Sequence, residues 1–155
     1  MFSTKYVATS LFAGTIAGLA QPAAAVDPTA HTMHVYKTPW CSCCEAWTNH
    51  MKRLGYEVEV TEPNDLAQLR KQAGVPDEVQ GCHTAAIGGY AVEGHVPPEA
   101  IAKLLDERPK VHGISAPGMP QGSVGMGDDP SAQYDVVTFD AASATNSRVF
   151  YRAGR

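Results

Sequence analysis

The chain has 155 residues, of which 12 are Lys or Arg and 16 are Asp or Glu, so its formal net charge at pH 7 is −4 with histidine neutral. This length suits one domain with its own hydrophobic core. The acidic balance and the lack of a basic stripe exclude nucleic acid as an expected partner.

Residues 1–25 have the pattern of a secretory signal peptide. Lys5 supplies a positive start, residues 6–20 are apolar or small, and Ala23-Ala24-Ala25 is a small-residue cleavage site. The stretch is too short and too weakly apolar for a membrane anchor, so we expect cleavage after about Ala25 and no membrane insertion afterwards. Cleavage removes Lys5 and no acid, which leaves 11 Lys and Arg against 16 acids, a net charge of −5. Residues 26–155 are then expected to form a single domain in an oxidising exported space, the bacterial periplasm.

Turn residues and apolar periodicity predict the elements of this domain. Trp47, Met51 and Leu54 recur at i, i+4 and i+7, the spacing of one helix face, and Gly55 ends that helix. Gly88-Gly89 joins two strands as a hairpin. In chain order we expect a strand at 33–37, a helix at 44–54, a strand at 56–60, a helix capped by Asn64 and carrying Leu66 and Leu69, strands at 84–87 and 90–92, and a helix opened by Pro97-Pro98. A long loop over residues 109–129 and a strand pair at 134–139 and 149–152 follow this β-α-β-α-β-β-α order.

The cysteines carry most of the chemistry in this sequence. Three fall within Cys41-Ser42-Cys43-Cys44, and the fourth, Cys82, is followed directly by His83. A thiol is both a soft metal donor and a redox centre. The cluster therefore indicates either thiol–disulfide exchange or capture of a soft metal ion.

A strand followed by Trp40-Cys41-Ser42-Cys43-Cys44 at the start of a helix resembles the thioredoxin fold, with Cys41 and Cys44 at that family's two cysteine positions. The amides and dipole of a helix N-terminus stabilise a thiolate there. Two departures stand out. Cys43 replaces the usual proline of the motif, and Cys82-His83-Thr84 takes the place of the family's cis-proline. The resemblance thus places Cys82 and His83 beside the cysteine motif.

Further blocks extend the resemblance over residues 33–150. They are Pro39-Trp40-Cys41-Ser42-Cys43-Cys44, His50-Met51, Cys82-His83-Thr84-Ala85, Gly89-Tyr90, Glu93-Gly94-His95-Val96-Pro97 and Pro117-Gly118-Met119-Pro120 to Gly125-Met126. Together they are similar to the CopG-type family of periplasmic copper-resistance proteins. This resemblance implies a thioredoxin-like α/β fold, copper binding through the cysteines and a role in copper tolerance.

The donor chemistry agrees with a copper site. Thiolates bind Cu(I) strongly, imidazole and thioether bind it serviceably, and bridging sulfur lets four thiolates hold more than one ion. We expect the metal ligands to be Cys41, Cys43, Cys44, Cys82, His83, Met119 and Met126. Zinc is the less favoured alternative, because Cys and His are its usual ligands. Two structural disulfides are a third interpretation, although the cluster would close unusually short loops.

Other donors are weaker candidates. Met119 and Met126 lie in a Gly- and Pro-rich loop, and packing against the core is the alternative role for both. His95 and His112 border the same region, and His31 with Met33 and His34 would bind Cu(II) loosely at the start of the exported domain.

The sequence therefore supports two functional hypotheses. The first is a periplasmic protein for copper resistance and homeostasis that binds Cu(I), cycles the oxidation state of copper and exchanges it with other copper-handling proteins. The second is a thiol–disulfide oxidoreductase in which Cys41 attacks and Cys44 or Cys43 resolves the mixed disulfide. Whether the protein is an enzyme stays open at this point.

Overall fold

A computed structural model describes residues 32–141, 143 and 147–155. The predicted signal peptide and His31 lie outside these residues. Within the described part, none of the helices has the length and apolar character needed to cross a membrane.

The chain alternates short strands and helices. In order, the elements are β1 (Met33–Tyr36), α1 (Ser42–Arg53), β2 (Val58–Thr61), α2 (Ala67–Gln72), the 3-10 turn η2 (Asp77–Val79), β3 (Thr84–Ile87), β4 (Tyr90–Gly94), α3 (Pro98–Glu107), β5 (Gly113–Ala116), β6 (Tyr134–Phe139) and β7 (Val149–Ala153). The predicted order up to α3 is confirmed, and so are the helix start at Pro98 and the hairpin at Gly88-Gly89.

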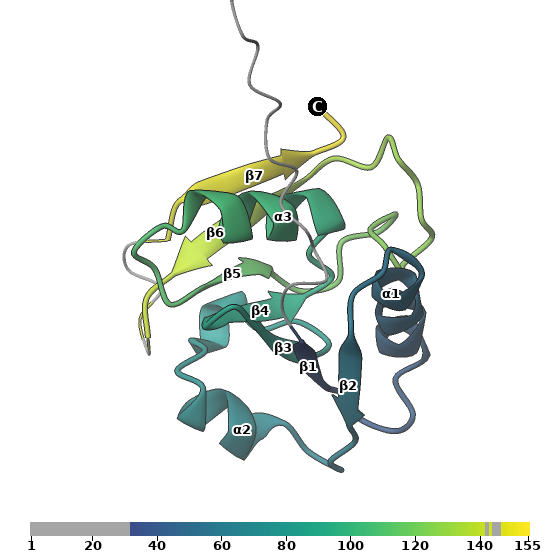
Figure 1. Cartoon of the computed structure of the whole chain (residues 1–155), viewed down its shortest axis with the longest axis vertical. Coiled ribbons are helices and arrows are strands. Elements are labelled where there is room, and N and C mark those ends of the chain that lie inside the picture. Colours follow the sequence, from purple (N-terminus) through teal and green to yellow (C-terminus); the bar gives the residue numbers. More distant parts are fainter. Residues whose placement is uncertain (1–31, 142, 144–146) are drawn as a thin grey trace, which may run out of the picture.

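The strands form one mixed sheet in the order β2-β1-β3-β4-β5-β6-β7 (Figure 1). β1 is parallel to β2, whereas β3 is antiparallel to both β1 and β4. β4 and β5 are parallel, and β6 and β7 continue the sheet antiparallel. A mixed α/β fold is therefore confirmed, with the cysteine motif at the start of α1 as the thioredoxin-like prediction requires.

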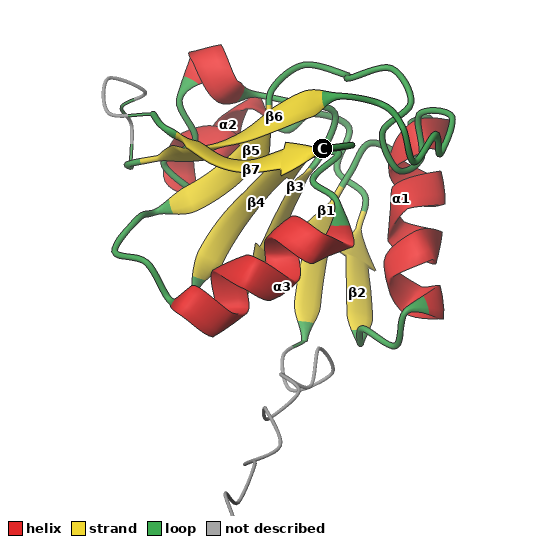
Figure 2. Cartoon of the chain, turned by 90° about the horizontal axis from the view of Figure 1, so that it is seen from above, coloured by secondary structure: helices red, strands yellow, loops and turns green. Residues whose placement is uncertain are grey.

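Helices cover both faces of the sheet, with α3 on one face and α2 on the other (Figure 2). Trp47 and Met51 of α1 share a fully buried core with Ile101 of α3 and with Met33 of β1. This packing fixes α1, and with it the cysteine motif, against the sheet. Leu54, the third residue of the predicted apolar face, is instead the exposed C-cap of α1.

Other predictions about the elements are wrong in detail, among them the strand predicted at 56–60, which is β2 at Val58–Thr61. The predicted loop 109–129 contains β5, whose four residues are all buried between β4 and β6. A Cβ on Gly113 would lie 2.2 Å from the carbonyl oxygen of Ala91, so the close pairing of β5 with β4 needs glycine there. Helix α2 begins at Ala67 after Leu66 rather than at Asn64, and the Asp65 carboxylate accepts the Ala67 amide at 3.0 Å.

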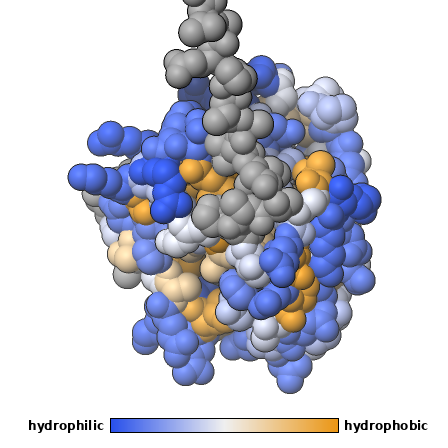
Figure 3. Space-filling view, viewed as in Figure 1, coloured by the Kyte–Doolittle hydropathy of each residue, from blue (hydrophilic) through white to orange (hydrophobic). Residues whose placement is uncertain are grey.

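The surface shown in Figure 3 is mostly hydrophilic, with separate apolar patches between charged side chains. The most exposed large apolar residues of the described part are Trp40, at 69% exposure, and Met119, at 61%. Both lie near the cysteines. Trp40 directly precedes Cys41, and Met119 follows Gly118, which forms an isolated β-bridge with Gly81, the residue before Cys82.

Candidate metal centre

The cysteine motif forms the first turn of α1. Cys41 is the N-cap residue in an extended conformation, and Cys44 points into the protein and is fully buried. A disulfide joins Cys41 to Cys44, with their Cα atoms 5.3 Å apart. Cys43 and Cys82 keep free thiols. Two of the four predicted thiol ligands are therefore oxidised in this state.

The fold brings the fourth cysteine to this turn from 39 residues away. Cys43 Sγ lies 3.7 Å from Cys82 Sγ and 3.5 Å from Cys41 Sγ. All four sulfur atoms lie within 4.8 Å of one another, and no other group of three or more Cys, His, Asp or Glu donors is so arranged among the described residues. The arrangement predicted for Cys82 beside the motif is what the structure has.

A buried ion pair holds the segment that carries Cys82. The carboxylate of Glu93, fully buried on β4, accepts the Gly81 amide at 2.9 Å and the Thr84 hydroxyl at 2.6 Å. Arg70 Nη2 donates to Glu93 at 2.9 Å and to the Gly81 carbonyl at 2.6 Å. Both polar groups of Gly81, the residue before Cys82, are thus held by this pair.

The sequence analysis did not identify Arg70 or Glu93 as part of the site. The available signal was a glutamate in an otherwise apolar strand, because a buried charge needs a partner. Burial raises the pKa of Glu93, against the opposing effects of Arg70, the Thr84 hydroxyl and the Gly81 amide.

The same surroundings act on the Cys82 thiol. Burial raises its pKa to about 12, helped by the hydrogen bond and the charge of Cys43 and by Glu93, while Arg70 opposes the shift. The metal-free thiol therefore keeps its proton at neutral pH, and a bound metal ion must displace that proton.

His83, a predicted ligand, does not belong to the group of four sulfur atoms. Its ring is fully buried between Trp47, with ring centroids 4.4 Å apart, and His95, at 5.2 Å. Burial lowers the pKa of both imidazoles, so both rings are neutral at pH 7.

Residues 117–126, the methionine loop, form an ordered structure that contacts the first turn of α1. Gly122 N and Met126 N donate within the loop at 2.8 and 2.7 Å. A Cβ on Gly125 would lie 2.6 Å from the carbonyl oxygen of Cys43, so the loop rests directly on the first turn of α1. Met126 is half-buried, whereas the exposure of Met119 shows that packing against the core, the alternative considered for it, is wrong.

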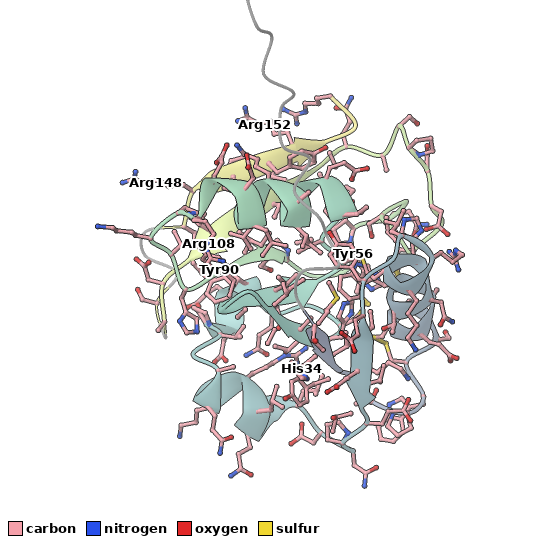
Figure 4. All side chains as sticks on the ribbon, in the orientation of Figure 1. His34, Tyr56, Tyr90, Arg108, Arg148 and Arg152 are labelled. Atoms are coloured by element: carbon pink, nitrogen blue, oxygen red, sulfur yellow. A yellow bond between two sulfur atoms is a disulfide. The ribbon has the colours of Figure 1, made fainter. Side chains whose placement is uncertain are left out.

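The weaker histidine candidates are elsewhere. His34 lies on β1 beneath the centre of Figure 4 and pairs with Glu59 at 3.0 Å, while Met33 is part of the core. His112 bonds through Nε2 to the Ala73 carbonyl and contacts Phe139. Neither histidine shares a group with the thiols.

Comparisons with known proteins found one matching family profile and similar solved structures. The profile of a family described as "Protein of unknown function, DUF411" matches residues 79–126, which include Cys82, Glu93 and the methionine loop. A solved structure titled "Copper resistance protein copG- Form 1" superposes with a TM-score of 0.71 at 34% identity, covering 80% of this chain and 98% of that chain. The "Form 2" structure gives a TM-score of 0.70 at 34% identity, covering 79% and 97%. Among curated protein sequences there is no match.

The fold and the site define a mixed α/β protein with a thioredoxin-like element order and four cysteine sulfur atoms grouped as a potential metal centre. The identity and coverage place it further. The chain belongs to the family of CopG copper resistance proteins.

The raised pKa of Cys82 predicts that its thiol reacts slowly with alkylating reagents. At pH 8 a shift from 9.0 to about 12 leaves roughly 1,000-fold less thiolate, which a roughly 20-fold gain in intrinsic nucleophilicity offsets only in part. We expect iodoacetamide to alkylate Cys82 roughly 50-fold more slowly in the folded, disulfide-bonded protein than in urea, as measured by peptide mass spectrometry. Glu93→Gln removes a charge that raises this pKa and should speed the reaction, whereas Glu107→Gln on the surface should not. Equal rates in folded and unfolded protein would contradict the shift.

Proposed function

We propose that this protein binds Cu(I) for copper resistance and homeostasis, with Cys41, Cys43, Cys44 and Cys82 as the central ligands. The observation that carries the proposal is the grouping of these four sulfur atoms within 4.8 Å in a member of the CopG family. Copper is here the cargo or substrate that the protein handles.

The donor set favours copper over zinc on chemical grounds and by family. Cu(I) is a soft ion that prefers thiolate and thioether sulfur, and bridging thiolates allow the site to hold more than one ion. Zinc would also accept four thiolates. Membership of a copper-resistance family and the methionines of the adjoining loop support copper.

The disulfide makes copper binding depend on redox state. Reduction of the Cys41–Cys44 bond by two electrons, from two external thiols or one dithiol that become a disulfide in turn, supplies the two missing thiolates. In the reverse direction, two Cu(II) ions each accept one electron from these thiolates, which yields two Cu(I) ions and the disulfide. The same pair of sulfur atoms can therefore couple the oxidation state of copper to that of the protein.

The proposed location is the bacterial periplasm, supported by the signal-like pattern of residues 1–25 and by four cysteines, two of them in a disulfide. Other copper-handling proteins of that compartment are the proposed partners in metal exchange.

Copper stoichiometry tests the proposal. The reduced protein, titrated anaerobically with Cu(I) against a chromophoric chelator, should bind at least one ion per chain tightly. The disulfide form should lose most of this affinity, and so should Cys82→Ser. The matched control is Ser42→Ala in the same turn, which should leave copper binding unchanged. A four-thiol site would be refuted if Cys82→Ser lowered neither the amount nor the affinity of bound copper.

The methionines are proposed as additional ligands. Thioether binding is insensitive to pH, whereas thiolate and imidazole binding fails as acid protonates them. Met119→Leu with Met126→Leu should therefore weaken Cu(I) retention most at pH 4 to 5, with little change in the melting temperature of the metal-free protein. Unchanged retention from pH 4 to 7, or a large loss of metal-free stability, would leave the methionines without a ligand role.

A thiol–disulfide oxidoreductase is the second candidate, and the Cys41–Cys44 disulfide at a helix N-terminus favours it. Cys41 is partly exposed beside the exposed Trp40, while Cys44 is buried, so Cys41 is the sulfur that a substrate thiol can reach. We expect insulin reduction by dithiothreitol to be accelerated and Cys41→Ser to abolish the acceleration. A rate equal to that of dithiothreitol alone would exclude this activity.

A further inference from the structure

A cavity of about 280 Å³ lies between α3, the two C-terminal strands and the methionine loop with the segment that follows it. Its lining includes Pro97, Glu99, Val124, Ala132, Tyr134 and Tyr151. No Lys, Arg or Cys lines it, and its one nitrogen base is His50. The cavity is therefore separate from the four sulfur atoms, and no Lys or Arg balances its acids.

Three polar side chains of this cavity have no bonding partner in the described part of the chain. Glu99, Tyr134 and Tyr151 form no side-chain hydrogen bond or ion pair there. Burial raises the pKa of Tyr134 to about 12, and the charge of Glu99 and the neighbouring Tyr151 add to the shift, so the three groups lie close together. Tyr134 is therefore neutral at pH 7, while the first turn of α3 stabilises the Glu99 carboxylate. The cavity thus presents a carboxylate without a counter-ion beside two aromatic rings.

Two aspartates at the same cavity add to its negative charge. Within the described residues, Asp128 and Asp129 accept hydrogen bonds only through Oδ1, the first from the Gly125 amide at 2.8 Å and the second from the Ser131 amide at 2.9 Å. The Ser131 hydroxyl and amide hold the pKa of Asp129 below its usual value, so this carboxylate is charged at pH 7.

This chemistry favours a cation as the ligand. The face of a tyrosine ring attracts positive charge, and a carboxylate pairs with it. The two cation–π contacts among the described residues use the rings of Phe150 and Tyr90, so no cation of that part lies over Tyr134 or Tyr151. A metal ion fits less well, because the four cysteines are the only close group of three or more Cys, His, Asp or Glu donors there. We therefore expect an organic cation.

We propose that this cavity binds a guanidinium group, paired with Glu99 and stacked on the ring of Tyr134 or Tyr151. A guanidinium is flat, weakly hydrated and always charged, and its parallel N–H groups match a carboxylate, whereas an ammonium is a strongly hydrated point charge. The volume is just below the roughly 300–1,000 Å³ of pockets for drug-sized ligands, which suits one group of side-chain size. The inference does not depend on the proposed copper function.

The methionine loop connects this cavity to the metal centre. Val124 lines the cavity, and Gly125, the next residue, packs against the Cys43 carbonyl in the first turn of α1. A bound guanidinium would therefore lie against the loop that rests on the cysteine motif. An arginine of a partner protein and a free guanidine compound supply the same group, so the test uses both.

The test titrates the purified protein with N-acetylarginine amide, which represents a peptide arginine, and with butylguanidine, a free guanidine compound. Changes in the amide NMR resonances of Val124, Tyr134 and Ala153 report binding in the cavity. We expect N-acetylarginine amide to bind at least about tenfold more tightly than N-acetylcitrulline amide, its uncharged analogue of nearly the same shape. Glu99→Gln should weaken the binding by a similar factor, whereas Asp106→Asn, which removes an exposed charge from the same helix outside the cavity, should not.

Equal binding of the arginine and citrulline compounds, or shifts confined to resonances outside the cavity, would overturn the inference. Binding of N-acetyllysine amide as tight as that of the arginine compound would also overturn it, because the site would then recognise charge alone. These ligand comparisons use the wild type, so they decide the matter even where Glu99→Gln fails to fold.

The two sources of the guanidinium are separated by affinity. Tighter binding of N-acetylarginine amide than of butylguanidine assigns the site to an arginine of a partner protein, and the reverse assigns it to a small guanidine compound. Because no cysteine lines the cavity, Cys82→Ser should bind the arginine compound as the wild type does. Failure of the copper proposal and failure of this inference are therefore distinguishable.

Discussion

The buried contact between Glu93 and Arg70 is the constraint on which the site depends. It holds both polar groups of Gly81 and so places Cys82, the next residue, against Cys43. Loss of one partner of a buried ion pair costs about 3–5 kcal/mol, a large share of the roughly 5–15 kcal/mol by which a domain is stable. The ion pair, whose disruption would destabilise the fold strongly, thus also fixes the position of the Cys82 sulfur.

Helix α1 connects the two kinds of donor. Its first turn carries three cysteines, and Trp47 in the next turn contacts His83 and anchors to Val96. Because Trp47 is part of the main core, the thiols and the imidazoles share one rigid support. In the proposed function, the Cys41–Cys44 pair would bind copper when reduced and accept electrons when oxidised, so one redox step would change the set of available ligands.

Local sequence patterns predicted much of the secondary structure of this protein. Residues 84–87 and 134–139 were predicted as strands with the bounds that β3 and β6 have, because β-forming residues there are bounded by turn residues. Pro98 marked the start of α3, and Gly55 the end of α1. The cysteine motif and its spacing indicated a soft-metal or redox centre, since residue type decides which chemistry a donor can do.

What the sequence determined by itself was the identity and local order of these elements and donors. The tertiary structure decided which of them meet. β5 exists because β4 and β6 flank Gly113–Ala116, whose own pattern is too short and small to predict a strand. Two contacts between different elements were not predicted, namely that of Arg70 with Glu93 and that of His83 with His95. The approach of Cys82 to Cys43 was predicted, but from the resemblance to a known fold and not from local pattern. Such contacts depend on how the strands are ordered in the sheet, and no local pattern records that order.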